Sequence, residues 1–284
     1  MDLRRTALLA VTAVAALALA LVTPLTAVAA PLTTTAAAAQ PPLRANPPIT
    51  PGVLMLSPVG PNSTSACTAA FVFTGPDATY LGYAAHCAAG GPATGLSGCA
   101  EETLALGTPV AIESNGFRTS GRLAYTSWGT MQEQGETDQA LCTFNDFALV
   151  ALDSGDAGRV DPTVPGLGGP TGLDSDGVDS GEPVYSYQPQ NGGQSVKSGK
   201  SLGDGSGGLT HHVETSPPGR PGDSGSGYLD ASGRAFGVLS TLFLDGSGSN
   251  GVTDLAHALT YANRYGGIGT VSLVLGEEPF AART

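Results

Sequence analysis

The stretch Gly222-Asp223-Ser224-Gly225 decides how this chain is interpreted, because two earlier segments supply residue types that complement its serine. These segments are Ala84-Ala85-His86-Cys87 and Asn145-Asp146-Phe147-Ala148-Leu149. A serine between glycines is common in turns and is a weak signal by itself. A histidine, then an aspartate in an apolar run, then that serine, in this order along the chain, is a much more specific pattern.

The three side chains are the types that acyl transfer requires. A serine hydroxyl becomes a good nucleophile when a neighbouring base takes its proton, and an imidazole suits that task near neutral pH. A buried carboxylate then fixes the tautomer of the imidazole. We therefore predict that His86 is the base, Asp146 its orienting carboxylate and Ser224 the nucleophile. The backbone N–H groups of Gly222 and Ser224 are predicted to form the oxyanion hole.

Each residue also has a structural interpretation. His86 ends an apolar run beside a cysteine, and Ser224 could be a turn residue. Asp146 interrupts the apolar run Phe144–Leu152, where an unpaired carboxylate would be costly to bury. The functional interpretation is favoured because His86 supplies the partner that a buried Asp146 requires.

The composition predicts an all-β fold. The chain has 284 residues, enough for one large or two small domains, and 41 of them are glycine. Short apolar runs separated by glycine-rich turns are typical of β architectures. The formal net charge of -12 argues against nucleic-acid binding and against docking on anionic membranes.

The first part of the chain has the features of an export signal. Residues 1–29 combine Arg4 and Arg5 with an apolar run from Ala7 to Val22 and a small-residue site at Ala27-Val28-Ala29. The run is short for a membrane anchor, the alternative interpretation. We predict a signal peptide over 1–29, a linker or short propeptide over 30–49, and a single catalytic domain over 50–284. The mature protein is expected outside the cell, with no membrane association after the signal peptide is cleaved.

Strands are expected wherever short apolar runs are bounded by turn residues. A late helix is expected to be capped by Thr253, to bury Leu255, Leu259 and Ala262 on one face, and to end near Gly266. The expected strands are Ala69–Phe73, Tyr80–Ala85, Val110–Ile112, Arg122–Tyr125, a run within Phe144–Leu152, Val184–Tyr187, Tyr228–Leu229, Phe236–Thr241 and the alternating segment Val271–Leu275.

Four cysteines in an exported chain predict two disulfides. They are Cys67, Cys87, Cys99 and Cys142, and the sequence alone permits three pairings. A metal site is disfavoured because no Cys-x-x-Cys spacing occurs. Neither a metal ion nor another cofactor is expected.

The three motif segments resemble those of trypsin/chymotrypsin-type serine proteases of the secreted bacterial kind. Ala84-Ala85-His86-Cys87 is similar to the family's Ala-Ala-His-Cys box, and Asp146-Phe147-Ala148-Leu149 to its Asp-Ile-Ala-Leu segment. Gly222-Asp223-Ser224-Gly225 matches its Gly-Asp-Ser-Gly box. The resemblance covers roughly Ala69 to Gly266. It implies two packed six-stranded antiparallel β-barrels, with the triad between them and a C-terminal helix.

The resemblance also implies how the cysteines pair. It makes Cys67–Cys87 the bridge beside the histidine and leaves Cys99–Cys142 for the other. The chain lacks an Ile-Val-Gly-Gly start after a basic residue. Asp223 is therefore expected to find a partner other than a newly formed amino terminus, and the sequence does not identify it.

Further residues bear on substrate binding. Ser240 resembles the serine that supports the triad carboxylate and starts the substrate-binding strand. Pro218 stands six residues before the nucleophile, where family members that cleave after Lys or Arg have Asp, so that specificity is not expected. Arg220, His211 and His212 either favour an acidic substrate side chain or are solvated loop residues.

These observations predict a monomeric, secreted serine endopeptidase that acts on proteins or peptides. Two alternatives remain open. One is a binding protein with a protease fold and no turnover, and the other is an esterase that uses the same triad.

Overall fold

The structure is a computed structural model that describes residues 48–91, 97–114, 116–243 and 248–283. It divides the chain into the units Met1–Pro42 and Leu43–Thr284, and every described residue belongs to the second. The predicted signal peptide and residues 30–47 of the predicted linker lie outside the described residues. Within the described ranges, no helix combines the length and the apolar character needed to cross a membrane.

The first sheet is antiparallel and has eight strands in the order β14-β3-β4-β7-β6-β5-β1-β2. The chain between β2 and β3 links distant parts of this sheet, because Ala69 N donates to Val53 O at 2.9 Å and Ala70 N donates to Gly82 O at 2.7 Å. The strands are β1 Leu54–Gly60, β2 Ser63–Thr68, β3 Val72–Thr74, β4 Thr79–Tyr83, β5 Pro109–Ser114, β6 Phe117–Thr126, β7 Ala148–Leu152 and β14 Ser272–Leu273.

The second sheet is a closed six-stranded barrel in the order β10-β13-β12-β11-β8-β9. The expected all-β, chymotrypsin-like fold with a C-terminal helix is confirmed, but the first sheet has eight strands where six were expected. The tail contributes β14 to this sheet by pairing it with β3. The strands of the barrel are β8 Pro183–Tyr187, β9 Val196–Gly205, β10 Thr210–Ser216, β11 Gly227–Leu229, β12 Ala235–Leu242 and β13 Asn250–Asp254.

The expected strands occur, but some bounds differ. The run from Ala69 becomes a strand only at Val72, and the run from Phe144 only at Ala148. The first three residues of the former run, 69–71, bond to neighbouring turns and strands outside the regular ladder. The helices are η1 Ala85–Ala88, α1 Ser127–Gln134, α2 Gln139–Phe144, α3 Ser154–Ala157, η2 Ser206–Gly208 and α4 Leu255–Tyr265.

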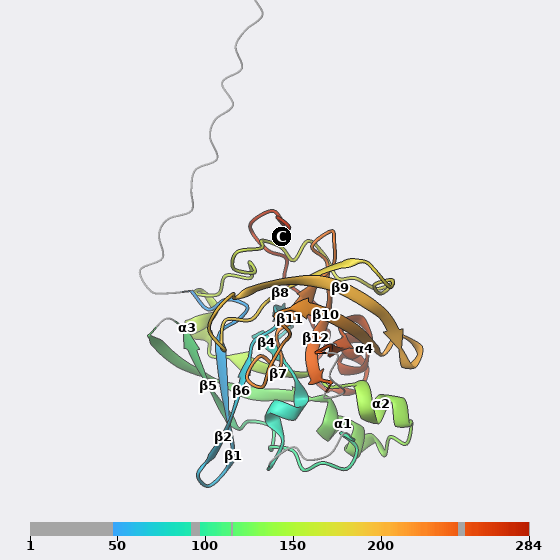
Figure 1. Cartoon of the computed structure of the whole chain (residues 1–284). Helices are drawn as coiled ribbons and strands as arrows, with labels where there is room; N and C mark the ends of the chain where they lie inside the picture. The colour runs from blue at the N-terminus through green and yellow to red at the C-terminus, as the bar shows by residue number, and fades with distance from the viewer. Residues whose placement is uncertain (1–47, 92–96, 115, 244–247, 284) are drawn as a thin grey trace, which may run out of the picture. The chain divides into compact units, whose positions relative to one another are not determined.

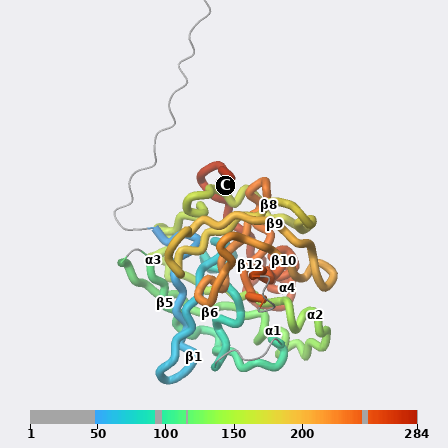
Figure 2. The backbone as a smooth tube through the Cα atoms, viewed as in Figure 1, coloured from blue at the N-terminus to red at the C-terminus, as the bar shows by residue number. Residues whose placement is uncertain are grey.

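Helix α4 is the predicted late helix, and it lies beside α1 and α2, which were not predicted (Figures 1 and 2). The predicted cap at Thr253 is wrong. The carboxylate of Asp254 caps the helix by accepting from His257 N, and the Thr253 hydroxyl donates to Phe144 O at 2.9 Å. The helix ends at Gly266, as expected.

Both disulfides have the pairing that the resemblance implied, Cys67–Cys87 and Cys99–Cys142. The first joins the end of β2 to η1. The second joins the segment that follows η1 to α2. The segments that carry the predicted histidine and aspartate are therefore each next to a covalent crosslink.

A buried ionic network stabilises the second barrel. The side chain of His211 is fully buried, with Nδ1 2.6 Å from Asp204 Oδ1 and Nε2 2.9 Å from Asp254 Oδ2. Both ring nitrogens donate at once only when the imidazole is protonated. Burial lowers the pKa of His211, but the hydrogen bonds and charges of Asp254 and Asp204 outweigh it and raise the pKa above 6.5.

Replacing His211 with Gln is expected to lower the free energy of unfolding by about 2 kcal/mol, because two carboxylates lose a charged donor. The loss should be full below about pH 6.5 and should shrink as pH rises through the raised pKa of His211, where the wild type loses its imidazolium. Urea unfolding of the wild type and of His211→Gln, at pH values below and above the pKa of His211, measures this loss of stability. His212→Gln, at the next position of β10, is the control, and equal pH dependence of the two variants would contradict the account.

Candidate active site

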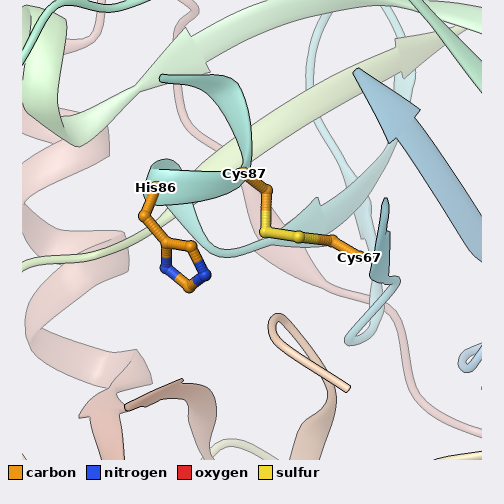
Figure 3. A group of neighbouring side chains, drawn as sticks. All are labelled: Cys67, His86 and Cys87. Carbon is orange, nitrogen blue, oxygen red and sulfur yellow. A yellow bond between two sulfur atoms is a disulfide. The ribbon is translucent and has the colours of Figure 1, made fainter. Parts of the chain in front are cut away.

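The predicted base lies on a short helix held by a disulfide. His86 belongs to η1, which follows β4 after a single residue, and its neighbour Cys87 is bonded to Cys67 (Figure 3). The imidazole and the two sulfur atoms form a compact group (Figure 3). Both sulfurs are committed to the disulfide, so this group does not offer thiolate ligands to a metal.

The predicted orienting carboxylate lies between α2 and β7. Asp146 is 3% exposed, and its position is fixed by Ser127, whose hydroxyl donates to Asn145 O at 2.6 Å and accepts from Phe147 N at 3.1 Å. A buried carboxylate needs compensating donors. The backbone on both sides of Asp146 is thus held by Ser127, independently of the contacts that the Asp146 side chain makes.

Three donors converge on the Asp146 carboxylate. The backbone N–H of His86 donates to Oδ1 at 2.8 Å, and His86 Nδ1 lies 2.7 Å from Oδ2. The Ser240 hydroxyl, on β12 of the second barrel, donates to Oδ2 at 2.6 Å. With Nδ1–H directed at the carboxylate, the other ring nitrogen of His86 is left as the acceptor, which is the tautomer that a general base requires.

The electrostatics favour an ionised Asp146 and a basic His86. Burial raises the pKa of Asp146, but the charge of His86 and the hydrogen bonds from His86 and Ser240 lower it below its ordinary value. Burial lowers the pKa of His86, but the charge and hydrogen bond of Asp146 outweigh it, so the pKa is raised above 6.5. The imidazole side chain is still 22% exposed and can reach a substrate.

The predicted nucleophile is held in a tight turn against the same region. Thr68 N donates to Ser224 O at 2.8 Å. Gly225 has φ +91°, and a Cβ there would collide with Thr68 O and lie 3.1 Å from Ala84 N, so only glycine allows this approach. Within the described residues, the Ser224 hydroxyl forms no hydrogen bond to His86. The turn therefore places Ser224 next to the segment before His86, without a formed serine–histidine hydrogen bond.

The backbone of this turn leaves two donors open. Gly222 has φ +99°, and its carbonyl accepts from the Thr68 hydroxyl at 2.8 Å. The N–H groups of Gly222 and Ser224 donate to no described residue, whereas those of Asp223 and Gly225 do. Two free N–H groups flanking one residue can bind an oxyanion.

The structure identifies the partner of Asp223 that the sequence did not reveal. Lys197 Nζ, on β9, lies 3.1 Å from Asp223 Oδ2 and donates to Pro218 O at 3.1 Å. The lysine and aspartate side chains are 4% and 0% exposed. Arg220 N also donates to Asp223 Oδ2, at 3.0 Å. The ion pair thus attaches the turn of Ser224 to the wall of the second barrel.

No protein-family model matches the sequence, and no curated protein matches it either. Solved structures do match. One is Thermobifida fusca protease A, at 20% identity and a TM-score of 0.50, covering 80% of this chain and 99% of that one. A second is a glutamic acid-specific serine protease described as using a histidine triad in substrate binding, also at 20% identity and a TM-score of 0.50, covering 80% and 100%.

The chain has the chymotrypsin-like fold of serine proteases. At this level of identity the match establishes the architecture. Within this chymotrypsin-like fold, His86 and Asp146 lie in connections of the first sheet, Ser224 lies in a connection of the second barrel, and Ser240 lies on its strand β12. The hydrogen bonds from Ser240 to Asp146 and from Thr68 N to Ser224 O therefore cross between the first sheet and the second barrel.

A pocket of about 130 Å³ adjoins Ser224. Asn250 is 1% exposed, and its side chain joins two walls of this pocket. The side chain accepts from Gly219 N and donates to Gly219 O, and it also donates to Thr241 O at 3.2 Å. Of the three residues considered for acidic substrates, Arg220 lines the pocket. His211 is buried in the barrel network, and His212 packs on Phe243. The described lining is Gly219, Arg220, Pro221, Ser224, Leu239, Ser240, Thr241, Leu242 and Asn250.

Removing the lysine of the buried ion pair tests its role. Lys197→Met leaves Asp223 charged and buried without its cation, and we expect it to lower the free energy of unfolding by about 3–5 kcal/mol. Lys200→Met is the matched control on the same strand, since Lys200 pairs with Glu214 at the surface and should cost less than about 1 kcal/mol.

Urea unfolding measures both variants. Adding Asp223→Asn to Lys197→Met should restore part of the stability, because the uncompensated charge is gone. Equal stability of the two lysine variants would contradict this role for the ion pair.

Proposed function

We propose that this protein is a secreted serine endopeptidase that uses His86, Asp146 and Ser224 as its catalytic triad. The observation that carries the proposal is the chain of hydrogen bonds from Ser240 through Asp146 to His86, which fixes the tautomer of a partly exposed imidazole. The chymotrypsin-like fold supports it, as does the tight turn in which Gly225, the neighbour of Ser224, lies against Ala84.

In the proposed reaction, Ser224 Oγ attacks the carbonyl carbon of a peptide bond while His86 Nε2 accepts the hydroxyl proton. The oxygen of the tetrahedral intermediate takes the negative charge and is bound by the N–H groups of Gly222 and Ser224. His86 then gives its proton to the leaving amine as the carbon–nitrogen bond breaks. In the second half of the reaction, His86 takes a proton from a water molecule whose oxygen attacks the acyl carbon. The bond to Ser224 Oγ then breaks, and His86 returns the proton to the serine.

The serine–histidine hydrogen bond would form as substrate binds. Catalytic hydrogen bonds are often long or poorly aligned without substrate and tighten in the Michaelis complex. Ser224 and His86 are attached to the same local framework through Thr68 and the Cys67–Cys87 bridge. A hydrogen bond from Ser224 Oγ to His86 Nε2 would complete the proposed triad.

The pocket beside Ser224 supports a substrate preference that excludes basic side chains. Its described lining contains no carboxylate and includes the cationic Arg220. It also contains no histidine, so the substrate binding by a histidine triad named for the glutamic acid-specific relative has no counterpart among these residues. We expect cleavage after uncharged or acidic residues rather than after Lys or Arg.

The setting proposed for this activity is extracellular. The N-terminal segment reads as a signal peptide, and two disulfides suit an oxidising compartment. The proposed partners are protein or peptide substrates, acted on by a monomer that needs no cofactor. Neither nucleic acid nor a membrane surface suits a chain with a formal net charge of -12.

A fluorophosphonate probe should label the folded protein at Ser224, and casein should be hydrolysed. Ser224→Ala should abolish both, because the nucleophile is gone. Ser226→Ala is the control, since the Ser226 hydroxyl is buried and donates to Asp223 O at 2.7 Å. Labelling that persists in Ser224→Ala would contradict the assignment. A folded wild type with no labelling would indicate a binding protein, and cleavage of esters but never of peptides would indicate an esterase.

A further inference from the structure

The N–H of Gly222, one of the two donors proposed for the oxyanion, belongs to a peptide group that lies outside the strands and helices. This group joins Pro221 to Gly222 in the turn between β10 and β11. Gly222 has φ +99°. Glycine adopts negative φ about as readily as positive φ, and it has no side chain. Residue 222 itself therefore offers little resistance to rotation of the peptide group.

The orientation of this peptide group decides what faces an oxyanion. The Pro221–Gly222 peptide is trans. In a planar trans peptide the N–H and C=O bonds point in opposite directions. A half-turn of the group would put the Pro221 carbonyl oxygen on the side that the Gly222 N–H now occupies. The site would lose a donor and gain an acceptor that repels the developing negative charge.

A side chain from a distant loop holds the peptide group in its present orientation. Asn191 Nδ2 donates to Pro221 O at 3.2 Å. The Asn191 amide also lies beside the glycine, because a Cβ built at Gly222 would be 3.7 Å from Nδ2. Among the described residues, no backbone N–H bonds to Pro221 O. The contact with Asn191 thus directs the carbonyl to one side of the turn and the Gly222 N–H to the other.

The loop that carries Asn191 is itself anchored. It runs from the end of β8 to the start of β9, and Gln188 N closes its base by donating to Ser195 O at 2.7 Å. Gln190 Nε2 donates to Gly52 O at 2.7 Å, which attaches the loop to the segment before β1. Asn191 is exposed, but its amide is presented by a loop that is held at its base and at the preceding residue.

The other peptide groups of the turn have partners of a different kind. The Gly222 carbonyl accepts from the Thr68 hydroxyl at 2.8 Å. The Asp223 carbonyl accepts from Ser226 N at 3.0 Å, so the backbone of the turn itself orients the Ser224 N–H. Of the two proposed oxyanion donors, the Gly222 N–H is thus the one whose orientation relies on a side chain from outside the turn.

We propose that Asn191 is a positioning residue for the oxyanion hole and locks the Pro221–Gly222 peptide with its N–H available to the substrate. The inference rests on the proposed protease function, because an oxyanion develops only in that reaction. Asn191 acts through the peptide group rather than on the substrate. Its loss should therefore lower kcat and leave KM nearly unchanged.

Asn191→Asp is the most informative variant, because it reverses the lock. The carboxylate cannot donate to Pro221 O, but it can accept a charge-assisted hydrogen bond from the Gly222 N–H once the peptide has turned over. kcat for peptide hydrolysis should fall about 10²-fold, the typical loss for one oxyanion donor, with KM within about twofold of the wild type. Asn191→Ala, which only removes the bond, should lower kcat about threefold to tenfold.

Gln194→Glu is the matched control. It makes the same change from amide to carboxylate at an exposed position of the same loop, and it should leave kcat and KM unchanged. Crystal structures of the wild type and of Asn191→Asp give a second readout that needs no turnover. They should show the Pro221 carbonyl directed at residue 191 in the wild type and the Gly222 N–H directed there in the variant.

Two kinetic results would overturn the proposal: equal kcat for Asn191→Asp and Gln194→Glu, or a rise in KM at constant kcat. An unchanged Pro221–Gly222 peptide in the crystal structure of Asn191→Asp would also overturn it. If Asn191→Asp does not fold, Asn191→Ala is judged by the same kinetic comparison. A wild type without activity would refute the proposed function, and the crystal structures would still decide whether Asn191 holds the peptide.

Discussion

The arrangement of this protein depends on one buried carboxylate. Asp146 receives donors from the backbone and the ring of His86 and from the hydroxyl of Ser240, and so it joins a connection of the first sheet to a strand of the second barrel. A carboxylate removed from water without such donors would be strongly destabilised, or would take up a proton. The same contacts that make its burial tolerable also orient the imidazole.

A second buried charge organises the turn that carries Ser224. The cation that compensates Asp223 comes from Lys197, on a strand of the same barrel. The turn is held on one side by this ion pair and on the other by Thr68, which bonds to Ser224 O and Gly222 O. The two open N–H groups of the turn are thus positioned by contacts already present within the folded domain.

The sequence predicted the parts of the site whose residue types are chemically rare. A histidine, a buried aspartate and a glycine-flanked serine are recognisable because few structural roles demand them together. The Lys197–Asp223 pair was missed because it depends on the register of β9 against the turn, which spacing does not encode. Helices α1 and α2 lack a clear apolar period, and Asp254 displaced Thr253 as the cap because its carboxylate reaches His257 N.

The most direct test of the central claim is the rate of peptide hydrolysis by Asp146→Asn, compared with the wild type at equal folded fraction. The substitution keeps the shape of the side chain but removes the charge and the acceptor that hold His86 in its tautomer. If the account is right, kcat should fall by about 10⁴-fold. A variant that folds normally and retains activity within about tenfold of the wild type would contradict it.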